Sequence, residues 1–307
     1  MSDPKQMTAG TSPALETMLL PRVDIQGLVG ETDLEKINEV GFELYKEVLS
    51  VVNLAAHLLD DSANAKGGWP RNQAICAGLM IRICKFMVVV THLSAQGNRA
   101  DVVHALNRSI MESAVNLEFL ARTDDNKYFE QFVKFSLGPE RELYDTIQAK
   151  IGAREGEVWP IEERMLKSIN DVCQVSGVRI EDVNRKYGDW GGGIRDRLKA
   201  IGKEEQYVVM QRIPSHAVHG TWVDLYKNHL EYDSKNNVFS PDPDFSLVDE
   251  RLLGPVAIFV LEATKPYLER FFAAIPEHTV LLDRISDLQK RILEADALHE
   301  GLMTKDK

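Results

Sequence analysis

Cysteine is scarce in this sequence, and its scarcity sets the first limits on the fold. The 307 residues contain three cysteines, an odd number that lacks the paired spacing of a zinc site. Cys76 and Cys84 lie within one apolar run, where we expect buried free thiols. A fold built on disulfides is therefore disfavoured, and we expect a protein of the reducing cytoplasm.

Positive charge is in deficit as well. Lysine and arginine number 36 against 47 aspartate and glutamate residues, which gives a formal net charge of −11. This balance opposes non-specific attraction to nucleic acid or anionic lipid. Any contact with RNA therefore needs a local basic patch.

Neither a secretory signal nor a membrane span is expected. The first residues, MSDPKQMTAGTSP, lack the basic segment followed by an apolar segment that marks a signal peptide. The most membrane-like stretch, 74–93, carries Arg82 and Lys85 near its middle. Because a charge at the bilayer centre costs roughly 3 kcal/mol on insertion scales, we interpret this stretch as a buried helix and expect no membrane partner.

The alternation typical of strands is missing from the chain. Apolar residues instead recur three and four positions apart, in long segments separated by Gly, Pro and Asn. With 44% hydrophobic residues the chain can bury a sizeable core. We therefore predict an all-α fold, a multi-helix bundle of about eight to nine helices. Helical segments are expected over 32–60, 71–95, 99–122, 126–150 with a break at Gly138, 160–175, 203–230 and 247–274, with a short helix after the turn at 188–193.

Composition divides the chain into three parts. Residues 1–30 form a loose N-terminal arm, 31–275 a helical domain, and 276–307 an amphipathic C-terminal helix. Pro241 and Pro243 predict a loop in the polar run that contains them, at 233–244. The C-terminal helix has about two apolar heptads, which is short for a free coiled coil, so docking in cis and pairing across a dimer are both open. Its apolar positions are Leu281, Ile285, Leu288, Ile292 and Ala295.

The segment 207–230, YVVMQRIPSHAVHGTWVDLYKNHL, is where we expect chemistry. It places Arg212 and His219 within about two helical turns of each other. The donors of an arginine match two phosphate oxygens, and an imidazole titrates near neutrality, so it can accept and donate a proton. Pro214 predicts a kink or a fresh helix start between them. Ser215 is expected to cap or pack, whereas His219 is either a proton carrier or a partly buried structural histidine.

A second polar stripe follows the helix expected over 99–122. Its members recur every four residues on a helix that is otherwise apolar nearly all round. A buried arginine or glutamate must be paired or hydrogen-bonded, because an isolated buried charge costs several kcal/mol. The arginine and glutamate of the stripe therefore either satisfy each other or support Arg212 and His219. The stripe consists of His104, Arg108, Glu112 and Asn116.

One local basic excess interrupts the acidic balance. Between 185 and 203, six basic residues stand against two aspartates. Three glycines at 191–193 precede a short helix whose N-terminus could meet an anion, with a plain flexible turn as the alternative. Because this stretch directly precedes Arg212 in the chain, we take it as a candidate RNA-binding flank. Its candidate nucleic-acid-binding residues are Arg185, Lys186, Arg195, Arg197 and Lys199, and Lys203 belongs to the same stretch.

These motifs resemble a bacterial all-α family of unknown function. The resemblance rests on NRSIMESAVNLEFLAR at 107–122, on the tryptophan–glycine turn at Trp190, and on Y-x4-R-x2-S-x3-H-G over 207–220. It covers roughly residues 70–230, with the motifs in the expected order. The N-terminal arm and the C-terminal heptads fall outside it.

Arg212 and His219 also fit the R-x4–6-H pattern of HEPN-domain proteins, helical proteins that include ribonucleases of toxin–antitoxin and phage-defence systems. In that group the two residues resemble a metal-independent ribonuclease pair, usually assembled across a dimer. The resemblance implies an HEPN-like core, RNA as a partner, a homodimer, and no cofactor or metal ion. His219 would help to activate the ribose 2′-hydroxyl and Arg212 would stabilise the extra phosphate charge. We add Glu112, Arg108 and Ser215 as supporting residues.

Two departures separate this chain from the HEPN pattern. Pro214 falls inside the motif, and apolar Ile213 replaces the usual polar residue after the arginine. Many HEPN-like domains are non-catalytic, so the analogy alone supplies no activity. The hypotheses are an HEPN-like ribonuclease in bacterial defence or stress, and a non-catalytic helical interaction module. A metal-dependent hydrolase would need His216, His219 and Glu112 to converge, and no HExxH pattern supports it.

Overall fold

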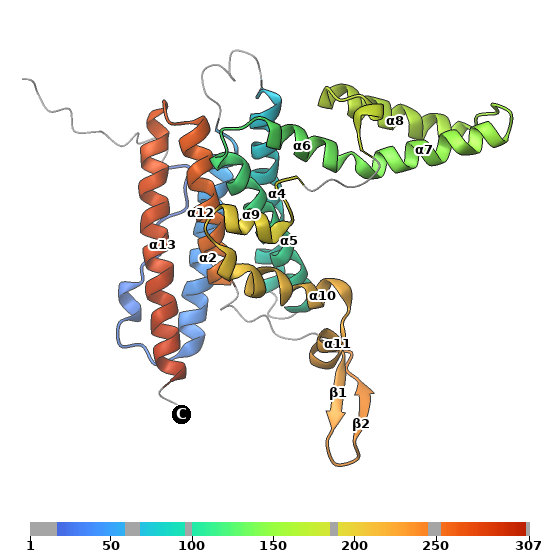
Figure 1. Ribbon diagram of the computed structural model, residues 1–307. Helices are drawn as coiled ribbons and strands as arrows, with labels where there is room; N and C mark the ends of the chain where they lie inside the picture. Colours follow the sequence, from blue (N-terminus) through green and yellow to red (C-terminus); the bar gives the residue numbers. More distant parts are fainter. Residues whose placement is uncertain (1–16, 59–67, 96–99, 185–189, 245–252, 305–307) are drawn as a thin grey trace, which may run out of the picture. The chain divides into compact units, whose positions relative to one another are not determined.

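The regular secondary structure of the described chain is almost entirely helical (Figure 1). The predicted all-α fold is thus confirmed, with one small hairpin added to it. The computed structural model describes residues 17–58, 68–95, 100–184, 190–244 and 253–304.

The chain forms two compact units. The first combines residues 1–122 with 203–307, and the second contains 123–202. The second unit is inserted between two stretches of chain that pack together. This division crosses the 31–275 helical domain that we expected from the sequence.

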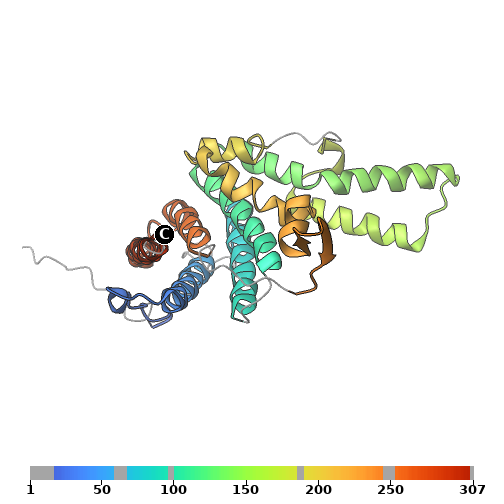
Figure 2. The ribbon, with the colours of Figure 1, turned by 90° about the horizontal axis from the view of Figure 1, so that it is seen from below.

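Long helices build the first unit. They are α2 (Leu34–Ala56), α4 (Arg71–Ser94), α5 (Ala100–Arg122), α12 (Leu253–Phe271) and α13 (Pro276–Met303), preceded by the short 3-10 helix η1 (Gln26–Leu28). α5 packs against α4 and α12, and α2 packs against α4, α12 and α13. Figure 2 views α13 nearly end-on, with α12 and α2 close to it. Large side chains such as Tyr45, Ile110 and Tyr267 are fully buried and form the core.

The C-terminal helix docks in cis. Leu281, Ile285 and Leu288 are fully buried, and α13 packs against α2 and α12. The heptad residues are therefore used within the chain and are not available to a coiled-coil partner.

α4 is the one helix in the described part of the chain that is long and apolar enough to cross a membrane. In the first unit it packs against α2 and α5. Arg82 and Lys85 lie on its exposed side, and Arg82 Nε donates to Ser113 Oγ of α5 at 3.1 Å. The apolar face of α4 is thus used in helix–helix packing.

The three cysteines are free and buried, as expected for Cys76 and Cys84. Burial raises the pKa of the Cys76 and Cys84 thiols to about 12. These thiols stay protonated near neutral pH, so they have little nucleophilic reactivity.

A β-hairpin occupies part of the run that we expected to be a loop, and that expectation is wrong. β1 (Leu230–Asp233) pairs antiparallel with β2 (Val238–Pro241), with Tyr232 opposite Phe239. The centroids of these two rings lie 4.9 Å apart, a cross-strand contact that stabilises the pair. Pro241 excludes a helix but is tolerated at the end of an edge strand.

Shorter helices build the second unit. They are α6 (Lys127–Ser136), α7 (Gly138–Ala153), α8 (Pro160–Ser176), the 3-10 helix η2 (Ile180–Asp182) and α9 (Ile194–Ala200). α7 and α8 pack against each other, and Arg154 donates to both oxygens of Glu162 at 2.6 and 2.5 Å. This arginine, together with the Trp159 N–H, lowers the pKa of Glu162.

The tryptophan–glycine turn before α9 is held by its own side chains. Arg197 is 6% exposed, lies over the Trp190 ring, and donates to the carbonyls of Trp190 and Gly192 at 3.0 and 2.7 Å. The Asp196 carboxylate accepts the Gly193 N–H at 2.9 Å, so this aspartate occupies the helix end that we considered for an external anion. Gly192 has a φ of +75°, and a Cβ there would lie 2.6 Å from Asp196 Oδ2.

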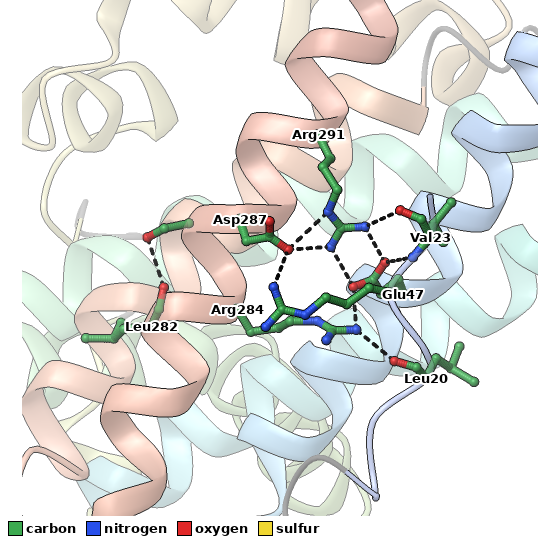
Figure 3. Close-up of polar contacts among 9 residues, drawn as sticks. Leu20, Val23, Glu47, Leu282, Arg284, Asp287 and Arg291 are labelled. Atoms are coloured by element: carbon green, nitrogen blue, oxygen red, sulfur yellow. Dashed lines mark hydrogen bonds and ion pairs between the residues drawn. The ribbon is translucent and has the colours of Figure 1, made fainter. Parts of the chain in front are cut away.

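One buried carboxylate joins α2 to α13. Glu47 of α2 is 1% exposed and is held by two arginines of α13 (Figure 3). Arg291 pairs with both of its oxygens at 2.7 Å, and Arg284 Nη2 lies 2.6 Å from Oε1. Asp287 offsets the extra positive charge by accepting from Arg291 Nη2 at 2.8 Å. The charges of this cluster are thus paired within the protein.

The same two arginines hold the chain that precedes α2. Arg284 Nη2 donates to the Leu20 carbonyl at 2.8 Å, and Arg291 Nη1 donates to the Val23 carbonyl at 3.0 Å. The Val23 N–H donates in turn to Glu47 Oε2 at 2.9 Å (Figure 3). The Glu47 cluster therefore joins three separate stretches of chain.

We expect Glu47→Gln to lower the free energy of unfolding by about 3–5 kcal/mol, because it leaves two buried guanidinium groups without their shared anion. Urea unfolding followed by circular dichroism measures the change. Glu43→Gln is the matched control on α2, because Glu43 pairs with Lys46 at the surface. The control is expected to stay within about 0.5 kcal/mol of the wild type. Equal losses in the two variants would contradict the role assigned to Glu47.

We expect Gly192→Ala to destabilise the second unit, because the new Cβ meets Asp196 at 2.6 Å and the backbone has a positive φ. The backbone term alone costs about 1–2 kcal/mol. In Gly193→Ala, the adjacent control, the Cβ lies 3.6 Å from Asp196 Oδ2 at a φ of −69°, so little change is expected. Differential scanning calorimetry compares the two variants, and a control that loses as much as Gly192→Ala would refute the explanation.

Candidate functional site

The candidate segment is a series of short helices. Its elements are η3 (Glu204–Gln206), η4 (Val208–Arg212), α10 (Ser215–His219) and α11 (Trp222–Asn228). η4 is a π-helix, in which the Ile213 N–H donates to the Val208 carbonyl five residues earlier at 3.0 Å. Pro214 has no N–H with which to continue this pattern, and α10 begins at the next residue. The interruption expected at Pro214 is thus a π-turn followed by a fresh helix start.

Lys203 anchors the start of this segment to the core of the first unit. Its ammonium group lies 2.6 Å from Glu118 of α5 and 2.7 Å from Glu262 of α12. Because Glu118 is fully buried, its charge requires a nearby cation. η4 and α10 then pack against α5. The candidate residues are therefore supported by the helical core.

Arg212 is the last residue of η4, and His219 is the last residue of α10. Both residues are exposed, and within the described ranges neither side chain has a hydrogen-bond or ion-pair partner. The partly buried, hydrogen-bonded histidine that was the alternative for His219 is not observed. Both groups can be reached by a ligand from solvent.

The neighbouring polar side chains are engaged locally. The Ser215 hydroxyl donates to the Gln211 carbonyl and so satisfies a backbone acceptor of the π-helix. Nδ1 of His216 lies 2.6 Å from Thr221 Oγ1. Ser215 is the first residue of α10, and its hydroxyl is engaged in this local contact. Of the two histidines in this short helix, His219 is the one without such a partner.

The polar stripe on α5 is half-buried and incompletely paired. Arg108 and Glu112 form no ion pair with each other, so their mutual pairing is not observed. Arg108 Nε and Asn116 Oδ1 are buried without a hydrogen-bond partner among the described residues. The stripe lies on α5, the helix on which η4 and α10 pack. The stripe itself makes no described hydrogen bond with Arg212 or His219.

The basic stretch contributes less exposed charge than its composition indicated. Arg185 and Lys186 lie outside the described residues. Arg195 and Lys199 are exposed on α9, whereas Arg197 is buried in the tryptophan–glycine turn. The guanidinium of Arg197 therefore stabilises the second unit and does not face solvent.

An exposed apolar surface on the candidate segment was not anticipated. Val209 is 66% exposed and Trp222 is 58% exposed. Trp222 packs edge-on against Phe239 of the hairpin, with ring centroids 5.4 Å apart. The sequence carried one signal for this exposure: the apolar residues of 207–230 do not fall on a single helical face. The exposed apolar surface consists of the exposed large apolar side chains of the segment, which are Val208, Val209, Ile213, Val218, Trp222, Val223, Leu225 and Tyr226.

A histidine–carboxylate contact after α11 was also not anticipated. His229 Nε2 lies 3.6 Å from Asp224 Oδ2, and Asn228 donates to the other oxygen of this buried carboxylate at 2.9 Å. In the described part of the chain, no group of three His, Cys, Asp or Glu side chains is placed to hold a metal ion. The convergence of His216 and Glu112 that a metal-dependent hydrolase requires is therefore not observed.

Comparison with known families places most of these features in one matched region. A model described as "Family of unknown function (DUF5677)" matches residues 73–237, which is more than half of the chain. The match begins near the start of α4, includes α5, the second unit and the candidate segment, and ends in the hairpin turn. Comparisons with curated proteins and with solved structures found no significant match. The chain therefore belongs to this family of unknown function, DUF5677.

Proposed function

We propose that this chain is a HEPN-like, metal-independent ribonuclease of bacterial defence or stress, with Arg212 and His219 as its working pair. The observation that carries the proposal is the joint exposure of the two side chains on a segment supported by α5. Neither has an internal partner among the described residues, so neither is engaged in stabilising the fold. A guanidinium and an imidazole available in this way suit a phosphodiester ligand.

The proposed reaction needs only these two groups and the RNA. His219 takes the proton of a ribose 2′-hydroxyl, and the resulting oxygen attacks the adjacent phosphorus. The bond between phosphorus and the 5′-oxygen breaks, and the imidazolium of His219 returns the proton to that oxygen. Arg212 binds the phosphate oxygens on which negative charge grows. The products are a 2′,3′-cyclic phosphate and a 5′-hydroxyl.

Exposed rings on the same segment support single-stranded RNA as the substrate class. Trp222 and Tyr226 of α11 are 58% and 45% exposed, and α11 contacts α10. Unpaired bases stack on such rings largely independently of sequence. Lys227, also exposed on α11, adds a positive charge near them. In the second unit, Arg195 and Lys199 are the exposed candidates for further phosphate contacts.

The exposed apolar surface favours a second candidate, a non-catalytic interaction module that associates as a homodimer. Exposed apolar side chains concentrated on one short segment are typical of protein–protein contacts. Val209, Ile213 and Trp222 are each more than half exposed. In this alternative the surface binds a second copy of the chain, and Arg212 and His219 carry no chemistry.

We expect the purified protein to cleave a mixed RNA pool in the presence of EDTA. His219→Ala and Arg212→Ala are each expected to lower the cleavage rate by about 100-fold or more, because each removes one catalytic group. Gel analysis gives the rates, and end-group analysis identifies the cyclic phosphate.

Two control variants separate this effect from a general change of surface charge. His57→Ala removes an exposed histidine at the C-cap of α2, and Lys227→Ala removes an exposed cation of α11. His57→Ala is expected to leave cleavage unchanged, and Lys227→Ala to affect RNA binding more than the rate at saturating RNA. Cleavage that persists in both His219→Ala and Arg212→Ala, or wild-type protein without activity, would refute the ribonuclease proposal.

The second candidate predicts self-association that depends on the apolar surface. Val209→Asp and Trp222→Ser are expected to weaken the dimer at least about tenfold, a change of 1.4 kcal/mol, because both place polar groups in the contact. Sedimentation velocity over a concentration series measures this, with His219→Ala as the variant that keeps its association. A wild type that sediments as a monomer at every concentration would remove this candidate.

A further inference from the structure

An exposed apolar stripe runs along α8 of the second unit. Its positions are spaced four, three, four and three residues apart, which is the a/d pattern of a helix–helix contact. At about 100° per residue, these positions fall within an arc of about 80° on one side of the helix. Ile161 is 45% exposed, Met165 is 38% exposed and Val175 is 79% exposed. The α8 stripe consists of Ile161, Met165, Ser168, Val172 and Val175.

The second unit packs against a different side of α8. Glu162, Ile169 and Cys173 are buried on that side, and α8 packs against α7 and η2. Figure 1 shows α7 and α8 side by side. The buried side lies about 100° around the helix from the α8 stripe. Because a surface helix needs a single apolar side to join its own unit, the α8 stripe is left for a partner from outside the unit.

Two charges of opposite sign flank the α8 stripe. Arg164 and Asp171 are exposed, and neither has an ion-pair partner among the described residues. They lie on the same flank, about 60° and 80° from the centre of the stripe. On the other flank, Glu162 and Ile169 are buried within the unit. Charge pairing beside the α8 stripe therefore involves Arg164 and Asp171.

An antiparallel pair of α8 helices satisfies both charges. With a two-fold axis between positions 166 and 167, the stripe pairs with itself, so that Ile161 meets Val172 of the second copy. Arg164 of each copy then comes opposite Asp171 of the other, which forms two ion pairs across the axis. In a parallel pair, Arg164 would face the other flank of the neighbouring helix, which is already buried within its own unit. A second copy in the antiparallel orientation is therefore the partner that matches this surface.

We propose that α8 is a homodimer contact, in which the α8 stripes of two copies pack antiparallel. The α7–α8 pairs of the two copies then form a four-helix arrangement that buries the stripe from solvent. The contact includes no residue of the candidate segment. It is therefore independent of the ribonuclease proposal and distinct from the exposed apolar surface.

The first test measures self-association of the full-length protein. Sedimentation velocity up to about 100 µM detects a dimer with a micromolar Kd. Met165→Glu is expected to weaken the dimer at least about tenfold, because it places unpaired charges inside the contact. Gln174→Glu is the matched control, since it adds the same charge at an exposed position of α8 away from the stripe, and it is expected to associate as the wild type does. Circular dichroism verifies that both variants are folded.

A charge exchange tests the antiparallel register. Arg164→Glu alone sets a glutamate opposite Asp171 of the second copy, and Asp171→Arg alone sets two arginines opposite each other. Each single variant is therefore expected to weaken the dimer at least about fivefold. The double variant restores two ion pairs and is expected to return to within about twofold of the wild-type Kd. Because the two positions lie about 10 Å apart along one helix, this rescue reports a contact between copies.

Three results would overturn the proposal. The first is a folded wild type that sediments as a monomer throughout the concentration series. The second is a dimer that Met165→Glu leaves intact; if Val209→Asp disrupts that dimer, the association belongs to the exposed apolar surface. The third is a double variant that associates as weakly as either single variant, which would show that Arg164 and Asp171 do not meet across a two-fold axis.

Discussion

The buried carboxylate of Glu47 is the constraint on which the first unit depends. A carboxylate removed from water between two helices is tolerated only when cations accompany it, and Arg284 and Arg291 supply them from α13. Apolar residues repeating every seven positions do not select one alignment of α13 along α2. The bidentate contact of Arg291 does, because a slip by one turn of about 5.4 Å would separate the charges. Apolar burial supplies the attraction between the helices, and the ion cluster sets their register.

That register also leaves a small pocket between α2, α12 and α13. Ile292, Ala295 and His299 recur along one face of α13, beyond the ion cluster, and line the pocket with Gly41 and Tyr45 of α2. Small side chains meet there, so the helices leave a space with polar atoms at its wall. A second buried carboxylate, Glu118, works in a comparable way by fixing Lys203 at the start of the candidate segment. Each of these buried anions fixes the position of a segment through a partner distant in sequence.

The helices of the core were predictable because their signals are local. The helices expected over 71–95 and 99–122 are α4 and α5, with ends displaced by a single residue, since Gly, Pro and the apolar period mark both limits. The hairpin was missed because its two strands have only four residues each, too few to show a period, and are joined by a contact between Tyr232 and Phe239. Arg212 and His219 were chosen as candidate residues from residue type and spacing. Their exposure depends on how η4 and α10 pack on α5, which residue type does not reveal.

The sequence by itself determined the helical class, the positions of the long helices and the residue types available for chemistry. These follow from apolar periodicity and turn residues, which act over a few positions. Only the tertiary structure decided that Arg197 is buried while Arg212 is exposed, that residues 123–202 form a unit of their own, and that α13 docks in cis. Those outcomes depend on contacts such as that between Glu47 and Arg291, 244 positions apart. Burial and charge pairing over such separations are properties of the folded chain, so local pattern cannot specify them.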